Sequence, residues 1–270
     1  MLPNNIMLIG GGASIRYLGA LDKGLFTYLQ DKFTIGLNYS YKFFNTTFQM
    51  GNDQGLYNSV DERKGSHEEI AKLPLWVGKE YKCLKNREPN SIFLKYSKKY
   101  DRDLKSGVYK GTLTGISAIS LAIFLMDLAK NQDKLSQSGI VPAIYLLGFD
   151  SGQIEIDGKP ILDSKGLPLT SWYQEEFRHP GTGKVSMYKQ IRTDLNSKTK
   201  RSCADYDYLP FTQVKDVKIY NVGGLSKIPH FEHISYEDFF MKKLTIVHNQ
   251  DALRNEIREI LLWLKTENNI

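Results

Sequence analysis

Cysteine is scarce in this chain of 270 residues, which contains only Cys83 and Cys203. Two cysteines exclude a disulfide-stabilised scaffold and a four-cysteine zinc site. Long hydrophobic runs are also missing, because the longest mainly apolar stretch, Ile116 to Met126, has 11 residues and is followed by Asp127. That length is too short to cross a bilayer. Since Met1 to Asn5 carry no charged side chain before a glycine-rich turn, we expect no signal peptide and a cytoplasmic protein.

Hydrophobic and aromatic residues are plentiful, at 41% and 12% of the chain, with 16 tyrosines and 13 phenylalanines. This composition argues against disorder. A chain of this length buries about three quarters of its unfolded surface. We therefore expect one domain over residues 1–270.

The net positive charge comes from one segment, Lys79 to Lys110, which contains 10 basic and 4 acidic residues. Tyrosines and a phenylalanine are interspersed among these charged residues. This composition is typical of a segment that binds nucleic acid or a polyphosphate. The charges follow neither a helical nor a strand period, however, which favours a solvated lysine-rich surface. Nucleic acid is therefore the alternative partner here.

Short apolar runs that stop at glycine or a polar residue predict buried strands at 5–9, 33–37, 143–148 and 217–222. Helical spacing of apolar residues predicts helices over 15–29, after Gly115, and over 251–265. A strand, a turn, a helix and a second strand in succession form a βαβ unit with parallel strands. The predicted fold class is α/β, with a Rossmann-like, mostly parallel sheet and helices on both faces.

The segment 151–208 is richer in Gly, Ser, Lys and Asp than its flanks. Asp157-Gly158 stands between two apolar-containing runs, which predicts a β-hairpin. Because the segment leaves the carboxyl end of a predicted strand, we expect a loop-rich lid inserted over a ligand site.

Four polar features follow predicted strands, namely Gly10 to Ser14, Asn38, Asp150 and Asn221. Ligands of open parallel sheets bind at the carboxyl ends of the strands. Glycines let the backbone approach a ligand, so a side chain at Gly11 would occupy the space of a phosphate or ribose. A helix beginning near Ser14 would offer N–H groups to a phosphate. A tight structural turn has the same glycines, and a carboxylate at Asp150 can also serve as a cap.

Two common nucleotide motifs do not fit the glycine turn. No Gly-Lys-Ser/Thr follows it, so it is not a P-loop. The final glycine of GxGxxG is missing, and Asn38 stands where a dinucleotide fold has an acid for the ribose diol. A nicotinamide dehydrogenase is disfavoured.

Three motifs resemble one group of proteins. Ile6 to Ser14 resembles the strand and G-x-G-P-S opening of the family-42 sialyltransferases and of the domain-of-unknown-function-115 group. That group includes archaeal 6-hydroxymethylpterin pyrophosphokinases and uncharacterised phage and bacterial members. Phe33 to Asn38 is similar to their next strand, and Leu113 to Ile119 with Ile144 to Asp150 is similar to their T-S/T-G helix and I-Y-L-x-G-x-D strand. The matches cover about 45 residues in the correct order, with Ala13 in place of the usual proline.

The resemblance implies roles for particular residues. Nucleotide phosphate or ribose would be surrounded by Gly10, Gly11, Gly12 and Ser14, with Asn38 facing the nucleotide or the transferred group. Thr114 and Gly115 would present a second helix N-terminus to the ligand. Asp150 would bind the nucleotide sugar or a metal-bound phosphate, or orient the acceptor. His179, in the lid, corresponds to a histidine that serves the sialyltransferases as general base.

Tyr173, Tyr188 and Lys189 belong to the same lid and are suited to neutralise a departing phosphate. The favoured function is a nucleotide- or nucleotide-sugar-dependent transferase of the glycosyltransferase, sialyltransferase-like kind, acting on small-molecule donors and acceptors. The alternatives are a pyrophosphokinase-like enzyme that uses Mg²⁺ through Asp150, and a non-catalytic nucleotide- or nucleic-acid-binding protein of viral or mobile-element origin. We expect no permanently bound cofactor; the metal and the homo-oligomeric state stay open.

Overall fold

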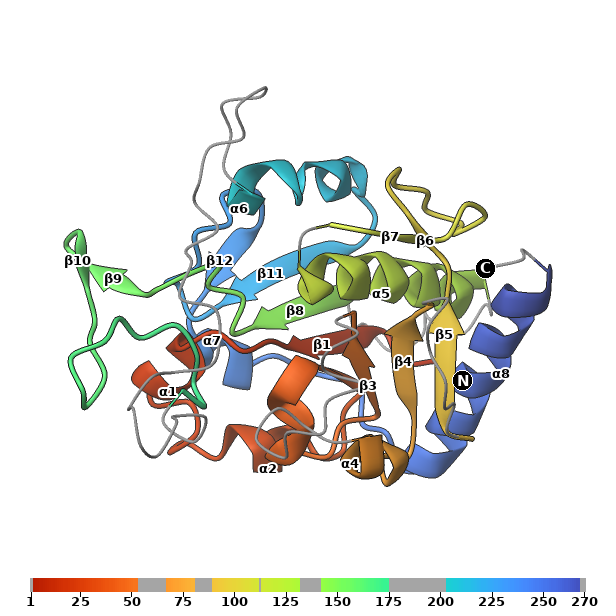
Figure 1. Ribbon diagram of the computed structural model, residues 1–270, viewed down its shortest axis with the longest axis horizontal. Helices are drawn as coiled ribbons and strands as arrows, with labels where there is room; N and C mark the ends of the chain where they lie inside the picture. Colours follow the sequence, from red (N-terminus) through yellow and green to blue (C-terminus); the bar gives the residue numbers. More distant parts are fainter. Residues whose placement is uncertain are drawn as a thin grey trace.

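The computed structural model describes residues 2–52, 67–80, 89–111, 113–131, 142–174 and 203–267. Within them, eight strands form one sheet in the order β12-β11-β8-β1-β2-β3-β4-β5, with every neighbouring pair parallel (Figure 1). The strands of this sheet are β1 (Asn5–Ile9), β2 (Thr34–Leu37), β3 (Phe48–Gly51), β4 (Trp76–Lys79), β5 (Ser91–Leu94), β8 (Ala143–Leu147), β11 (Lys218–Val222) and β12 (Glu232–Ile234). The predicted α/β fold with a Rossmann-like sheet is confirmed.

The four predicted strands are β1, β2, β8 and β11, and each lies within one residue of its predicted bounds. The sequence pattern misses β3, β4, β5 and β12, which have only three or four residues each. In β3 the pattern is further interrupted by Gln49, which is buried. Its amide is satisfied because Gln49 Nε2 donates to Ser40 Oγ at 2.9 Å and to the Asn38 carbonyl oxygen at 3.2 Å.

The helices are α1 (Ser14–Tyr17), α2 (Leu25–Leu29), α4 (His67–Ala71), α5 (Thr114–Asn131), α6 (Cys203–Tyr206), α7 (Tyr236–Phe240) and α8 (Gln250–Glu267), with 3₁₀ segments η1 (Asn38–Lys42) and η4 (Leu209–Gln213). Helices α5 and α8 confirm two predictions. The single helix predicted over 15–29 is wrong, because α1 ends at Tyr17 and α2 begins at Leu25. Gly19 and Gly24 adopt φ values of +69° and +76°, which a continuous right-handed helix does not allow.

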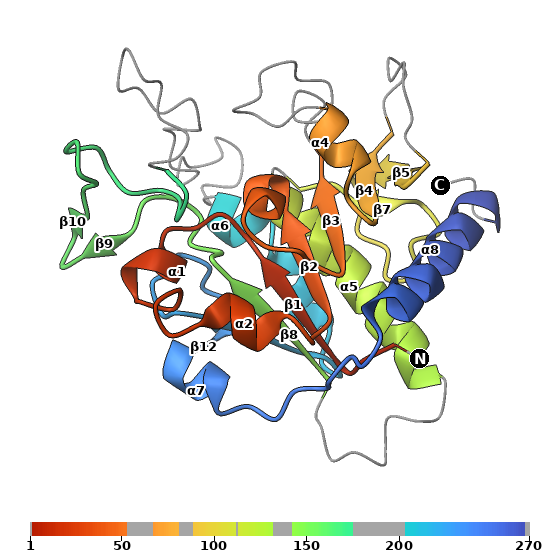
Figure 2. The ribbon, with the colours of Figure 1, turned by 90° about the horizontal axis from the view of Figure 1, so that it is seen from below.

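The sheet is covered on both faces, as the alternation of side chains along β1 shows. Ile6 and Leu8 are buried in the same cluster as α5 and α8, whereas Met7 and Ile9 are buried with α1, α2 and α7. In the view from below, α1, α2 and α7 lie on one side of β1 and α5 lies on the other (Figure 2). Two-sided cover explains why strands such as β8 are apolar throughout.

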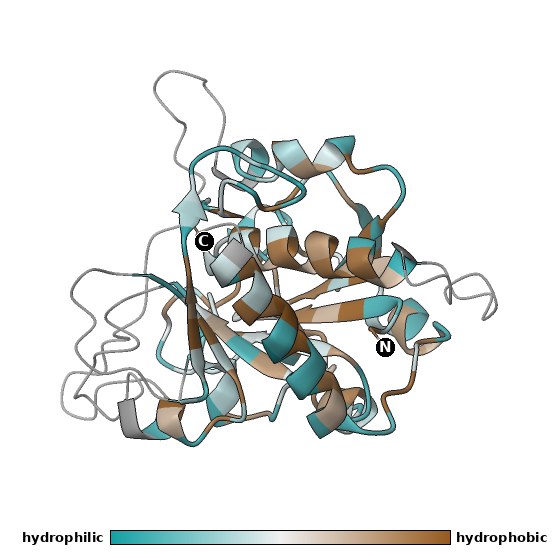
Figure 3. Ribbon diagram, turned by 90° about the vertical axis from the view of Figure 1, so that its right-hand side faces the viewer, coloured by the Kyte–Doolittle hydropathy of each residue, from teal (hydrophilic) through white to brown (hydrophobic). Residues whose placement is uncertain are grey.

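Helix α5 is buried on nearly all sides, and it packs against β1, β2, β3 and β8. In Figure 3 it is mostly brown, whereas α8 mixes brown and teal residues. The buried stripe of α8 consists of Leu253, Ile257, Leu261 and Leu264. Among helices in the described part of the chain, none has the length and apolar character of a membrane span.

The predicted hairpin around Asp157-Gly158 is confirmed by the antiparallel pair β9 (Glu155–Ile156) and β10 (Lys159–Pro160). This pair extends away from the sheet at the left of Figure 1. A second small sheet pairs β6 (Tyr96–Ser97) with β7 (Val108–Tyr109).

The basic segment Lys79 to Lys110 runs from the end of β4 past β7, and its residues 81–88 lie outside the described ranges. Arg102 binds Asp127 through Nε at 2.6 Å and Asp216 through Nη2 at 2.7 Å. These ion pairs compensate a part of the segment's charge with acids from α5 and from the loop before β11.

The packing of α8 is tested by two neighbouring leucines. Leu261 is fully buried, whereas 43% of Leu262 is exposed. We expect Leu261→Ala to lower the free energy of unfolding by about 2–5 kcal/mol, because it leaves a cavity in the core. Leu262→Ala should cost less than about 1 kcal/mol. Urea unfolding of both variants measures the difference; equal costs would show that α8 does not pack as described.

Candidate functional site

The order in which strands are added to the sheet reverses between β1 and β8. From β1 the chain builds β2 to β5 on one side, and it later adds β8, β11 and β12 on the other. The loops after β1 and β8 therefore leave the sheet in different directions and form a crevice at their carboxyl ends. Backbone hydrogen bonds join the two loops, because Gly10 N donates to Leu147 O and Gly12 N donates to Gly148 O, both at 2.8 Å.

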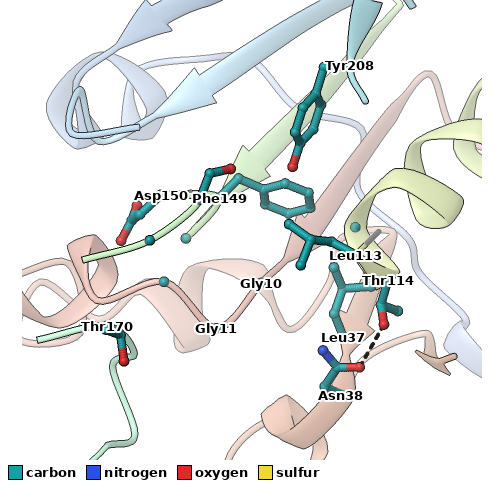
Figure 4. Close-up of a pocket in the computed structure, with 15 residues that line it drawn as sticks. Gly10, Gly11, Leu37, Asn38, Leu113, Thr114, Phe149, Asp150, Thr170 and Tyr208 are labelled. Carbon is teal, nitrogen blue, oxygen red and sulfur yellow. Dashed lines mark hydrogen bonds between the residues drawn. The ribbon is translucent and has the colours of Figure 1, made fainter. Parts of the chain in front are cut away.

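A cavity of about 160 Å³ lies at this position (Figure 4). It brings together residues from the ends of three strands and from the start of α5. The lining residues are Gly10, Gly11, Gly12, Leu37, Asn38, Leu113, Thr114, Gly115, Gly148, Phe149, Asp150, Ser151, Gly152, Thr170 and Tyr208. Seven of the predicted site residues thus meet in one place, although they come from segments far apart in the sequence.

Asn38 is held at the end of β2 by two contacts. Its backbone adopts φ +52°, a conformation that asparagine tolerates better than most residues. Thr114 Oγ1 donates a hydrogen bond of 2.9 Å to Asn38 Oδ1, and the Asn38 amide nitrogen points away from Thr114 (Figure 4). Gln49 Nε2 binds the Asn38 carbonyl oxygen. The side chain is therefore fixed with an N–H donor available to a ligand in the cavity.

Asp150 links the two loops through Ser14. Its Oδ2 accepts a 2.7 Å hydrogen bond from Ser14 N, and its Oδ1 accepts one of 2.6 Å from Ser14 Oγ. Only 2% of Asp150 is exposed. Burial raises the pKa of its carboxyl to about 6, and the two hydrogen bonds from Ser14 limit the rise.

The sequence predicts that Ser14, with the glycines, surrounds a nucleotide phosphate or ribose at the start of a helix over 15–29. Helix α1 has only four residues, and its first N–H donates to Asp150. The role of Ser14 toward a ligand stays a prediction. A carboxylate in that position would repel a phosphate. Asp150 accepts a hydrogen bond from the first N–H of α1, and its side chain also lines the cavity.

The N-terminus of α5 also reaches the cavity, through Leu113, Thr114 and Gly115. The first N–H groups of a helix lack partners within it, and an 18-residue helix carries a partial positive charge at this end. Among the described residues that line the cavity, none is a lysine or arginine. Of these residues, the first turn of α5 and the Asn38 amide are the groups that can attract an anion.

The glycines of the site are required by the protein itself. A Cβ at Gly12 would lie 2.6 Å from Asp150 Oδ2, and a Cβ at Gly115 would lie 2.5 Å from Phe149 Cε1. A Cβ at Gly11 would meet the Tyr173 hydroxyl at 2.5 Å. The sequence predicts that a side chain at Gly11 would occupy the space of a phosphate or ribose. In the structure such a side chain would also have to displace Tyr173.

Tyr173 belongs to a buried aromatic cluster behind the glycine turn. Trp172 donates from its backbone N to Gly11 O and from Nε1 to Gly10 O, at 3.1 and 2.9 Å. Burial raises the pKa of Tyr173 well above its usual range. Tyr173 is not among the residues that line the cavity. Of the other predicted lid residues, His179, Tyr188 and Lys189 lie outside the described residues.

Asn221 lies within β11, where it is buried and its Nδ2 donates to Ile228 O at 3.3 Å. It does not line the cavity. Sequence reasoning missed Phe149, Ser151, Thr170 and Tyr208. Ser151 directly follows a candidate residue, which was an available signal, but nothing in the sequence joins Tyr208 to the glycine turn.

Comparison of the chain with family models, curated proteins and solved structures finds no match. Within the described ranges, no group of three or more His, Cys, Asp or Glu side chains is placed to hold a metal ion.

The buried carboxyl of Asp150 makes stability depend on pH. Because its pKa is raised in the folded protein, ionisation costs free energy that is absent below about pH 4 and complete above pH 6. We expect Asp150→Asn to gain stability relative to wild type by up to about 3 kcal/mol as the pH rises from 4 to 7. Urea unfolding across this range, with carboxyl NMR titration, measures it. A pH-independent difference would contradict the buried, raised carboxyl; Asp103→Asn, at an exposed residue, is the control.

Proposed function

We propose that this protein binds a nucleotide or nucleotide-sugar in the cavity between β1 and β8 and transfers a glycosyl group from it. The observation that carries the proposal is the meeting of Asn38, Thr114, Gly115 and Asp150 at the switch point of a parallel sheet. This is where Rossmann-like sheets bind their ligands. The resemblance of the flanking motifs to the family-42 sialyltransferases supports the same class of reaction.

The phosphate of the ligand is proposed to bind at the N-terminus of α5. The first turn of the helix supplies N–H groups that have no partner within the helix, and the Asn38 amide adds a fixed donor beside them. The turn at Ser14 is a poor site for the phosphate, because Asp150 occupies its donors. The glycine turn then supports the cavity wall, and Asp150 contacts the uncharged part of the ligand.

In the proposed reaction, an acceptor hydroxyl attacks the anomeric carbon of the donor sugar. The new glycosidic bond forms as the carbon–oxygen bond to phosphate breaks, and the phosphate leaves with the electron pair. The acceptor proton passes to a base. The resemblance assigns this base to His179, and a general base typically contributes 10²–10⁴-fold to such a step.

The pyrophosphokinase-like alternative needs a Mg²⁺ site, usually built from one or two carboxylates and the substrate phosphates. Asp150 is the carboxylate that lines the described cavity, and both its oxygens accept hydrogen bonds from Ser14. This donor set suits magnesium less well than a neutral, hydroxylated ligand, so we favour glycosyl transfer.

The phosphate position is tested with Asn38→Asp. Aspartate also tolerates positive φ and is favourable near a helix N-terminus, so the variant should fold. Its charge should repel a phosphate and weaken the binding of CMP, UDP, GDP or ATP by about 10-fold or more. Calorimetry on the ligands found in a thermal-shift screen, with and without Mg²⁺, measures this.

Asn255→Asp, on the exposed face of α8, makes the same change in net charge and should leave affinity unchanged. The uncharged nucleosides should bind both variants alike. Unaltered nucleotide affinity in Asn38→Asp would place the phosphate elsewhere, and a wild type that binds no nucleotide would end the proposal.

The base is tested with His179→Ala. For glycosyl transfer we expect kcat to fall by about 10²–10⁴-fold while donor affinity is retained, because the base acts on the acceptor. For phosphoryl transfer, the substitution should leave kcat nearly unchanged, and EDTA should stop turnover by removing Mg²⁺. Steady-state rates with and without EDTA distinguish these outcomes, and full activity of the variant without metal would exclude His179 as the base.

A further inference from the structure

Tyr208 reaches the cavity from the chain between α6 and η4. Only 1% of the residue is exposed, and its ring packs edge-on against Phe231 at a centroid distance of 6.0 Å. In Figure 4 the hydroxyl points into the cavity, toward Phe149 and Leu113. Burial raises the pKa of this hydroxyl well above its usual range, and the nearby Ser151 side chain offsets part of that rise. Tyr208 therefore presents a neutral, rigidly held hydroxyl.

Ser151 lies beside this hydroxyl. Its Oγ is buried and, in the described part of the chain, completes no hydrogen bond of ordinary distance and angle. Its backbone adopts φ +59°, a costly conformation for serine, between Gly148 and Gly152, which also have positive φ. Buried polar atoms without partners and backbone strain both concentrate at ligand sites.

The two hydroxyls complement each other once a ligand is present. When Tyr208 donates its proton to a ligand oxygen, its own oxygen is ready to accept from Ser151 Oγ. The hydrogen bond of Ser151 is then completed. The pairing needs a ligand oxygen that accepts a hydrogen bond from Tyr208, as the oxygen of a sugar hydroxyl does.

The position of Tyr208 argues against phosphate as its partner. Phe149 and Leu113 are drawn between the Tyr208 hydroxyl and the Asn38–Thr114 pair in Figure 4, and the proposed phosphate site is at that pair. Asp150, in the same cavity wall, disfavours a second anion. The cavity, at about 160 Å³, is also smaller than the 300–1,000 Å³ typical of sites for whole drug-sized ligands. It suits the part of such a ligand that comprises a phosphate and one sugar ring.

We propose that Tyr208, positioned by Ser151, binds a hydroxyl of a sugar ring and makes the site selective for hydroxylated sugars. The inference rests on the proposed function, because it requires a ligand in this cavity. The sugar is either the ribose of the nucleotide or the ring that is transferred, and both present the same chemistry.

The test compares wild type with Tyr208→Phe, which removes the hydroxyl and keeps the ring that packs on Phe231. Calorimetry uses CMP, UMP, AMP and GMP with their 2′-deoxy and 2′,3′-dideoxy forms. It also uses UDP-glucose, GDP-mannose and CMP-N-acetylneuraminate against their parent nucleotides. Tyr145→Phe is the control, because Tyr145 is buried in β8 but does not line the cavity.

If Tyr208 binds the ribose, wild type should prefer the ribonucleotide over the dideoxy form by about 10-fold, and Tyr208→Phe should lose that preference. If it binds the transferred sugar, the variant should instead lose the preference for nucleotide-sugar over nucleotide. Ser151→Ala should reduce the same preference in either case. It provides an independent measurement should Tyr208→Phe fail to fold.

Unchanged sugar preferences in both folded variants would overturn the role of Tyr208 and leave the proposed function standing. A wild type that binds none of the probes would overturn both. The control variant should keep the wild-type preferences.

Discussion

The pairing of Asp150 with Ser14 joins the loops that follow the two central strands, β8 and β1. Asp150 lies three residues after the end of β8 and Ser14 begins α1, so the loops on either side of the switch point are linked by a buried carboxylate. Backbone hydrogen bonds from Gly10 and Gly12 connect the same region. The shape of the cavity depends on these two loops. They also determine the positions of Phe149 and Ser151, which line the cavity.

The same pairing divides the two helix N-termini near the cavity into different roles. The N-terminus of the short helix α1 already binds an anion of the protein itself, because Ser14 N donates to the Asp150 carboxylate. The long α5 keeps its end toward the cavity. The described lining residues include no lysine or arginine, so within them the start of α5 is the end of the cavity that favours a negative charge. The ligand orientation proposed above follows from this difference.

The centre of the fold was predictable because its strands are apolar on both faces. Short apolar runs bounded by turn residues, such as Ile6 to Ile9 and Ile144 to Leu147, are typical of buried parallel strands. The short edge-side strands were not predictable, since β3 contains Gln49 and gains its stability from side-chain hydrogen bonds that depend on the folded loop of Asn38 and Ser40. Gly19 and Gly24 interrupt the helix that was predicted over 15–29. The prediction failed because the leucines of this segment have helical spacing across both glycines.

In the site, residues that directly follow predicted strands were found, as for Asn38 and Asp150. Their partners were not, because the Asp150–Ser14 contact and the approach of Tyr208 depend on tertiary packing between distant segments. The glycines at positions 10, 11 and 12 predicted a ligand-binding loop, but the sequence did not reveal their structural role. Two of these glycines are required by contacts with Asp150 and Tyr173, which no local pattern contains.

The strand order also affects how the chain folds as it is synthesised. β1 is central in the finished sheet, yet its partner β8 begins only at Ala143. Until the ribosome has released that segment, β1 is an exposed edge of a half-sheet, with unpaired N–H and C=O groups and apolar side chains on both faces. Such edges pair with other chains, and long-range parallel pairing is slow to form. In the nascent protein, β1 is therefore exposed to pairing with other chains until β8 has been made, although it is fully buried in the finished sheet.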